Sequence, residues 1–229
     1  MNDGCIRLVK IALGFGADID CIHVGKTPFQ LLFCRICQSQ SQSQNQNQSQ
    51  SQSQSQSQSQ TETIWKDIEM LNLLYKNGAD INKIDDFTLH EGWAPLHYAT
   101  NLGCTNQIKW LLDRYADVNI RSSNGETPLM RACAYGELKI ILLLLKNKAE
   151  LTWQSYSGLT VLHFAAKSGN LIVLKFLLEC GINKYIRSND GLLAVDICRM
   201  YGFKECEEFL LKKSISYDHK AKSIIIKHL

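Results

Sequence analysis

Apolar residues recur at helical spacing in several short runs along the chain. Three of these runs are QIKWLLDRYADVN at 107–119, LKIILLLLKNKAE at 138–150 and LIVLKFLLECGIN at 171–183. Each run leads into a short polar segment, which is the pattern of amphipathic or buried helices separated by turns. The sequence therefore predicts a series of short helices.

Glycines place these runs in a regular frame. Gly92, Gly125, Gly158 and Gly191 are spaced by 33 residues, and each is followed eleven residues later by Gly103, Gly136, Gly169 or Gly202. The segment between two such glycines, for example GETPLMRACAYG at 125–136, predicts a first helix, and the apolar run after it predicts a second. The chain is therefore expected to be a repeat protein.

The local chemistry of one unit supports this interpretation. Thr127 is placed to cap the first helix, and Pro128 occupies its first position, where a missing N–H costs nothing. Gly136 ends that helix, and the second helix is expected from about Leu138 to Asn147. Two helices this short cannot bury their apolar faces alone, so the units must stack.

The repeated segments identify a family. APLH at 94–97, TPLM at 127–130, TVLH at 160–163 and the GADIN ending at 78–82 resemble the ankyrin repeat. The resemblance implies an all-α repeat solenoid of stacked helix-turn-helix units with projecting β-hairpin-like loops. We divide the chain into an N-terminal half repeat at 1–24, an interrupted repeat at 25–91, repeats at 92–124, 125–157 and 158–190, a capping repeat at 191–213 and a tail at 214–229. The half repeat lacks its first helix, so it is either a frayed cap or the start of a piece of a longer protein.

A polar tract interrupts the first complete unit. Glutamine occupies every even position of 38–60, with serine or asparagine between, and the tract holds no apolar or charged side chain. The chain from Thr27 to Ala79 spans 52 residues against 22 from Thr127 to Ala149, an excess of 30 at the expected turn between the two helices. We interpret the tract as a disordered insertion that costs about 2 kcal/mol of loop-closure entropy. Its Ser-Gln pairs resemble kinase target sites and its amides could self-associate, but its strict period favours an expanded microrepeat tolerated in a loop.

Composition limits the partners. Lys and Arg number 25 against 22 Asp and Glu, so the net charge of +3 does not indicate binding to nucleic acid or to an acidic membrane. No apolar run is long enough to span a bilayer, and the N-terminus does not resemble a signal peptide. Nine cysteines in helical segments indicate reduced thiols. We expect an intracellular monomer in the cytoplasm, with the nucleus as the alternative.

The residues that could carry chemistry have structural explanations. In the ankyrin family the histidine at the positions of His97 and His163 bonds between loops, and Gln30, Met130 and Asp196 replace it elsewhere, which should weaken that bond. Cys34 and Cys37 have metal-ligand spacing but lack a second pair of ligands, so we interpret them as small apolar residues on a helix. No nucleophile triad or phosphate loop is present. We expect no enzyme, no cofactor and no metal site.

Binding is expected instead on the concave side of the array, where stacking does not constrain the side chains. Aromatic side chains on that strip are typical of interface hot spots. The predicted protein-binding residues are His90, Trp93, Asn101, Leu102, Asn124, Glu126, Tyr135, Trp153, Tyr156, Leu159, Lys167, Asn189 and Tyr201. The predicted function is a non-catalytic scaffold or adaptor that binds an unidentified protein. The alternative is a substrate-recruiting or targeting segment of a larger enzyme, such as a ubiquitin ligase component or an ankyrin-bearing kinase.

Overall fold

The computed structural model describes residues 14, 16–18, 20, 27–34, 36–37, 68–85 and 92–212. The Gln/Ser tract at 38–60, the tail at 214–229 and most of the half repeat at 1–24 lie outside the described residues. The first complete unit contributes helical residues 28–34, 36–37 and 68–76. The later helices are α4 (Pro95–Asn101), α5 (Thr105–Leu112), α6 (Pro128–Tyr135), α7 (Leu138–Lys146), α8 (Val161–Ser168), α9 (Leu171–Glu179), α10 (Ala194–Met200) and α11 (Lys204–Leu211).

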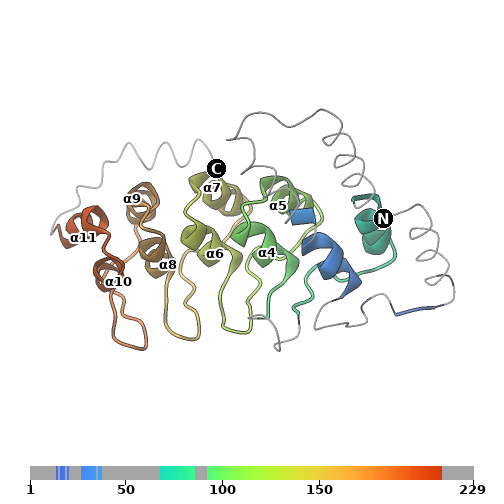
Figure 1. The fold of residues 1–229 in the computed structure, drawn as a ribbon, viewed down its shortest axis with the longest axis horizontal. Helices are drawn as coiled ribbons and strands as arrows, with labels where there is room; N and C mark the ends of the chain where they lie inside the picture. The colour runs from blue at the N-terminus through green and yellow to red at the C-terminus, as the bar shows by residue number, and fades with distance from the viewer. Residues whose placement is uncertain are drawn as a thin grey trace, which may run out of the picture.

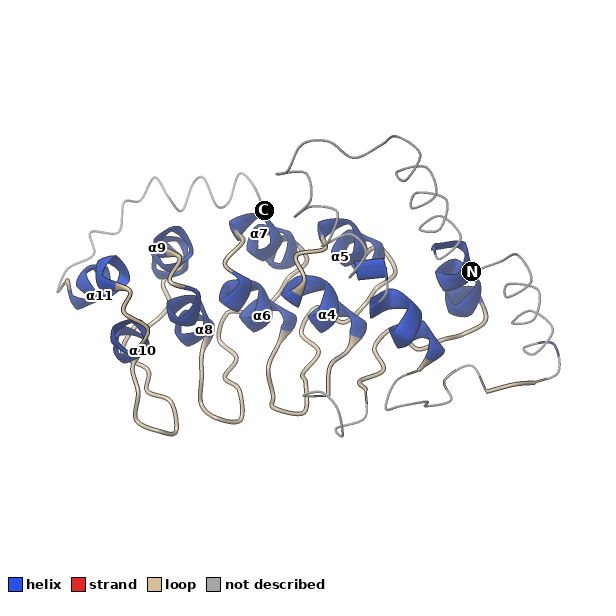
Figure 2. Ribbon diagram, viewed as in Figure 1, coloured by secondary structure: helices blue, strands red, loops and turns tan. Residues whose placement is uncertain are grey.

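The helices form two layers along one axis. The first helices α4, α6, α8 and α10 lie side by side, and the second helices α5, α7, α9 and α11 form the other layer (Figure 1). Loops project from the layer of first helices on the side away from the second helices (Figure 2). Apart from an antiparallel bridge between Gln154 and Thr160, the described residues form only helices, turns and loops. The all-α repeat solenoid is confirmed.

Helix α6 begins and ends with the expected local chemistry, and α8 ends in the same way. The Thr127 hydroxyl accepts a hydrogen bond from Met130 N at 3.4 Å, and Pro128 is the first helical residue. Gly136 and Gly169 adopt φ of +83° and +67° at the ends of α6 and α8, a conformation that a side chain would strain. The chain thus turns back after about two helical turns, and the second helix packs on the first.

Small side chains let the first helices approach closely. Ala99, Ala132 and Ala165 occupy equivalent positions and are fully buried where neighbouring first helices meet. Aliphatic side chains of the second helices, such as Ile141 and Leu144 on α7, are also fully buried in the same continuous core. Each such side chain contributes about 1.5–3 kcal/mol by leaving water. The core therefore extends from unit to unit, as stacking requires.

Polar side chains link the closing segments of successive units. The Asn119 side-chain oxygen accepts from Glu150 N at 2.9 Å, and that of Asn82 accepts from Asp117 N at 2.9 Å. Asp20 accepts from Asp80 N at 3.3 Å in the same way. The Asn or Asp that ends these three segments thus satisfies a backbone N–H of the next unit.

Candidate functional site

The projecting loops are closed by a repeated side-chain contact. Ser122 N donates to Glu126 O at 2.9 Å, and the Ser122 hydroxyl accepts from Glu126 N at 3.1 Å. Ser155 and Ser188 close the next two loops with the same contacts. Asp85 takes this place in the unit that ends at residue 91, where its carboxylate accepts from Trp93 N and from the Tyr98 hydroxyl. These contacts fix the loops and so the side chains that the loops carry.

Backbone hydrogen bonds join neighbouring loop tips. Tyr156 N donates to Asn124 O at 2.9 Å, and Asn189 N donates to Ser157 O at 2.9 Å. Ser123 N donates to Gly92 O at 3.3 Å at the equivalent place. The tips therefore form a continuous edge rather than independent loops.

The two equivalent histidines hold loops together and are not placed for catalysis. His97 Nδ1 accepts from Ala94 N at 3.2 Å, so its Nε2 carries the proton and donates to Glu126 O at 3.0 Å. His163 pairs in the same way with Thr160 N and Leu192 O. Burial lowers the pKa of His97 to about 4 and also lowers the pKa of His163. Both rings are neutral at pH 7, as a structural hydrogen bond requires.

The structure corrects the prediction that glutamine at this position weakens the inter-loop bond. Gln30 Oε1 accepts from Thr27 N at 2.7 Å, and Gln30 Nε2 donates to Lys83 O at 2.5 Å. The amide therefore makes the same bond at the start of its helix and still donates to the next loop, although to a carbonyl at a different position from Glu126 O. Asp196 retains the first, since its carboxylate accepts from Leu193 N at 2.9 Å. Met130 is fully buried and leaves Thr127 to cap the helix.

An arginine covers one of the predicted aromatic residues. The Arg131 guanidinium lies 4.4 Å from the centre of the Trp93 ring, and Arg131 Nε lies 2.7 Å from Glu126 Oε2. Burial raises the pKa of Glu126 to about 7, and the positive charge of Lys167 acts in the opposite direction. The Tyr98 ring meets Trp93 edge-on at 5.1 Å. The Trp93 ring therefore contacts both Arg131 and Tyr98.

A second arginine lies between two aromatic rings at the loop tips. The Arg121 guanidinium is 4.8 Å from the Trp153 ring centre and 4.7 Å from that of Tyr156. Its NH2 group also donates to Gln154 O at 2.9 Å. The sequence did not single out Arg121 and Arg131, because neither is aromatic. The sequence does contain a signal for Arg121, because Arg187 stands at the same distance before Gly191 as Arg121 does before Gly125. Arg187 donates to Gly191 O at 2.6 Å.

The predicted binding residues differ widely in exposure. Tyr135, Tyr156, Lys167, Asn189 and Tyr201 are exposed. Trp93, Asn101, Leu102, Asn124, Trp153 and Leu159 are half-buried, and Glu126 is buried. His90 lies outside the described residues. We call the twelve described residues of this set the tip strip.

The described residues show neither a metal cluster nor a membrane-spanning helix. They contain no group of three or more His, Cys, Asp or Glu side chains arranged to hold a metal ion. Cys34 and Cys37 are buried on the first helix, and Cys104 Sγ donates to Cys37 O at 3.4 Å. None of the described helices is long and apolar enough to cross a membrane.

Two family models match the chain. One, described as ankyrin repeats in three copies, covers residues 63–155, and another, described as ankyrin repeats in many copies, covers residues 144–198. The two matches together extend over more than half of the 229 residues. The chain is an ankyrin repeat protein.

The curated relatives of this ankyrin repeat protein are mostly much longer. The human 2-5A-dependent ribonuclease is 31% identical over 75 residues, which are 33% of this chain and 10% of that protein. An ankyrin repeat protein of fowlpox virus (strain NVSL) is 37% identical over 67 residues, 29% of this chain and 34% of the relative. An E3 ubiquitin-protein ligase of Arabidopsis thaliana is 42% identical over 48 residues, 21% of this chain and 9% of the ligase. The chain thus spans between about a tenth and a third of the length of these relatives.

Proposed function

We propose that this ankyrin array is a scaffold or adaptor that binds a protein partner through the tip strip. Ankyrin repeats are protein–protein interaction modules. The observation that best supports the strip is its exposed aromatic content. Tyr135, Tyr156 and Tyr201 expose 48%, 63% and 52% of their surface. Tyrosine and arginine are enriched among the residues that carry most binding energy in interfaces.

The fixed geometry of the strip supports the proposal further. Tyr156 is tied to its neighbour through the bond from its N–H to Asn124 O, and Arg121 packs on its ring. A side chain that is already ordered loses less conformational entropy on binding, so more of its contact energy is retained as affinity. The strip is therefore suited to a partner that binds a rigid, preformed surface.

The proposal includes the remaining expectations about partners and location. We expect no binding to nucleic acid, because the net charge is only +3. We also expect a monomeric state. We also expect the protein to act inside the cell, in the cytoplasm or nucleus. All seven described cysteines are thiols rather than disulfides, in keeping with a reducing compartment.

A pull-down from native cell extract tests the strip. The variant Tyr156→Ala, Lys167→Ala, Tyr201→Ala removes exposed side chains from it. The matched control Tyr115→Ala, Lys139→Ala, Ile172→Ala removes exposed side chains from or next to the second helices α5, α7 and α9. A partner captured by the wild type and the control but lost from the strip variant, with unchanged helical circular dichroism, supports the proposal. Equal capture by all three proteins contradicts it.

The second candidate is a recruiting segment of a larger enzyme. It is favoured by the relatives, since the ribonuclease and the E3 ligase are each about ten times longer than the matched segment. In this case the array supplies recognition and another part of the protein supplies catalysis. A transcript whose reading frame continues upstream of Met1 or into a catalytic segment supports this candidate, and stop codons on both sides contradict it.

A further inference from the structure

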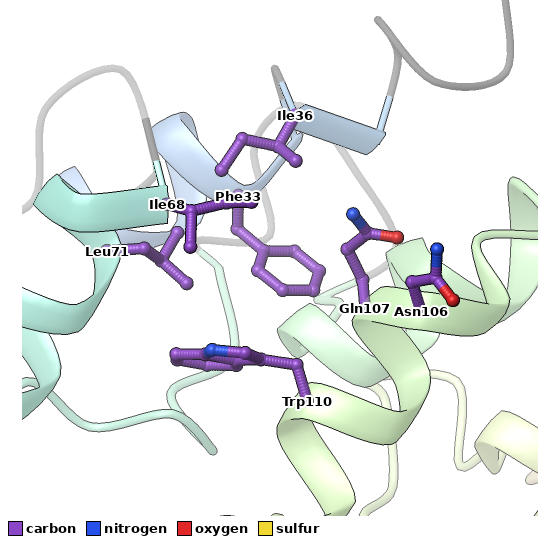
Figure 3. A pocket seen from close by; sticks show the side chains of 7 residues that line it. All are labelled: Phe33, Ile36, Ile68, Leu71, Asn106, Gln107 and Trp110. Carbon is purple, nitrogen blue, oxygen red and sulfur yellow. The ribbon is translucent and has the colours of Figure 1, made fainter. Parts of the chain in front are cut away.

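A pocket of about 170 Å³ opens between the first and second complete units (Figure 3). It is formed in part by second helices, residues 68–76 and α5, and so belongs to a different part of the fold from the loop tips. Its apolar wall consists of Phe33, Ile36, Ile68, Leu71 and Trp110. The amide side chains of Asn106 and Gln107 complete it.

The interruption of the first unit explains why the pocket exists. Ile36 stands eleven residues after Gly25, the position that Gly103, Gly136 and Gly169 occupy in later units. Ile36 is part of a helix, whereas the glycines of later units form a tight turn. The second helix of the same unit is described only from residue 68. The two helices are therefore not joined by the two- or three-residue turn of later units, and Ile36 and Ile68 both line the pocket.

One wall of the pocket is held in place by its neighbours. The Trp110 ring lies 6.1 Å from the Phe29 ring and 6.0 Å from that of Tyr75, measured between centres. The Arg114 guanidinium covers the same ring at 3.9 Å. A ring packed on several sides does not rearrange easily, so the pocket presents a preformed aromatic surface. Its size is comparable to a cavity of about 150 Å³ that binds benzene.

The polar lining of the pocket contains an unsatisfied acceptor. Gln107 is only 7% exposed, and its Oε1 has no hydrogen-bond partner among the residues that the structure describes. Ile140 and Val173 stand at the equivalent positions of the next two units, so a buried amide is not needed for stacking. A buried acceptor without a donor destabilises the protein. A ligand that brings a donor to this oxygen removes that penalty.

We propose that this pocket binds a small neutral molecule with an aromatic or branched aliphatic body and one hydrogen-bond donor directed to Gln107. Neutrality follows from the lining, which holds no charged side chain among its seven residues. The size of the pocket and its aromatic wall favour a ligand with an aromatic or branched aliphatic body. The unsatisfied oxygen of Gln107 favours a ligand that carries a hydrogen-bond donor. Binding of a small molecule in this pocket is independent of partner binding at the tip strip.

Phenol and toluene form a matched pair of probes, because they have the same size and only phenol carries a donor. Binding is measured on the full chain from the chemical shifts of the Ile36, Ile68 and Leu71 methyl groups. We expect saturable shifts at these methyls with phenol, and toluene to bind at least about tenfold more weakly, a difference of about 1.4 kcal/mol. Gln107→Leu, which keeps the size but removes the acceptor, should abolish the preference for phenol.

Two further variants keep the test decisive. Gln154→Leu changes an exposed glutamine in a projecting loop and should leave both affinities unchanged. Ile68→Phe fills the pocket and should prevent the binding of both probes. This variant tests the pocket even if Gln107→Leu does not fold. The proposal is overturned if phenol gives no saturable shift at the pocket methyls, if its binding survives Ile68→Phe, or if phenol and toluene bind equally well.

Discussion

Gln30 donates from Nε2 to the carbonyl oxygen of Lys83 at 2.5 Å, across the same pair of loops that a histidine bridges in other units. His97 donates to the next loop at a different carbonyl, Glu126 O, at 3.0 Å. The amide and the imidazole are thus alternatives for one structural role. They differ in one respect, because only the imidazole takes up a proton near neutral pH.

Replacing His97 with Gln should make the protein more resistant to acid. The pKa of this buried imidazole is about 4 when folded and 6.5 in the unfolded chain. Between these pH values the unfolded state binds more protons, so the contribution of His97 to stability is present above pH 6.5 and is lost as the pH falls toward 4. His97→Gln removes this loss. The free energy of unfolding of the variant should therefore rise relative to wild type by up to about 3 kcal/mol between pH 7 and pH 4.

Urea unfolding at several pH values measures this difference. His97→Ala is the control, because it removes both hydrogen bonds as well as the titration and should be destabilising already at pH 7, by about 1–3 kcal/mol. Parallel pH profiles for wild type and His97→Gln would show that His97 does not titrate differently on folding.

Gly169→Ala should destabilise the protein more than Gly202→Ala. Both glycines end a first helix with positive φ, +67° and +76°, so both substitutions share a backbone strain of about 1 kcal/mol. A Cβ at Gly169 would lie 2.6 Å from the Phe203 ring of the next unit, whereas one at Gly202 meets none of the described residues within 4 Å. We expect an extra loss of about 1–3 kcal/mol for Gly169→Ala, seen in thermal or urea unfolding. Equal losses would mean that the Phe203 ring moves aside without cost.

Lys148→Gly should stabilise the array. Lys148 has φ of +68° at a position where Gly78 and Gly181 occur in other units, so its side chain is held in a strained conformation. Its side chain is exposed, and the carbonyl that Asn119 contacts belongs to the backbone. We expect a gain of about 0.5–1 kcal/mol in the free energy of unfolding. Lys139→Gly, an exposed position within α7, should instead cost about 1 kcal/mol, and a loss at both positions contradicts the prediction.

Deleting residues 38–60 should leave the fold intact and stabilise it slightly. The described helical residues on either side, 36–37 and 68, would then be joined by a segment about a quarter as long. Two halvings of loop length reduce the closure entropy by about 1 kcal/mol. Circular dichroism and thermal unfolding of the deletion variant check this. A large fall in the midpoint would show that the tract makes contacts that the repeat depends on.

The sequence predicted the repeat architecture because each of its signals acts locally. Gly136 and Gly169 end helices through their own backbone conformation, and Thr127 caps a helix through a contact three residues away. Such features depend little on the rest of the protein. The apolar faces of the helices then allow one arrangement, stacking of units, so the solenoid follows from the pattern.

Contacts between units were harder to predict. Arg131 covers Trp93 only because two first helices lie side by side, and Arg121 reaches Tyr156 only because neighbouring loop tips are joined. Sequence spacing gives no direct measure of either approach. The pocket was also missed, since it depends on the Ile36 end of one helix meeting Gln107 of another unit. The binding role of the tip strip stays a prediction.

The bonds between loop tips bear on how the molecule responds to tension. The bonds from Tyr156 N to Asn124 O and from Asn189 N to Ser157 O each connect one unit only to the next, and none spans two. A load applied at the ends is therefore carried by these junctions in series, and the weakest junction yields first. Under tension the array should therefore extend stepwise, with an outer unit detaching while the remaining units stay folded.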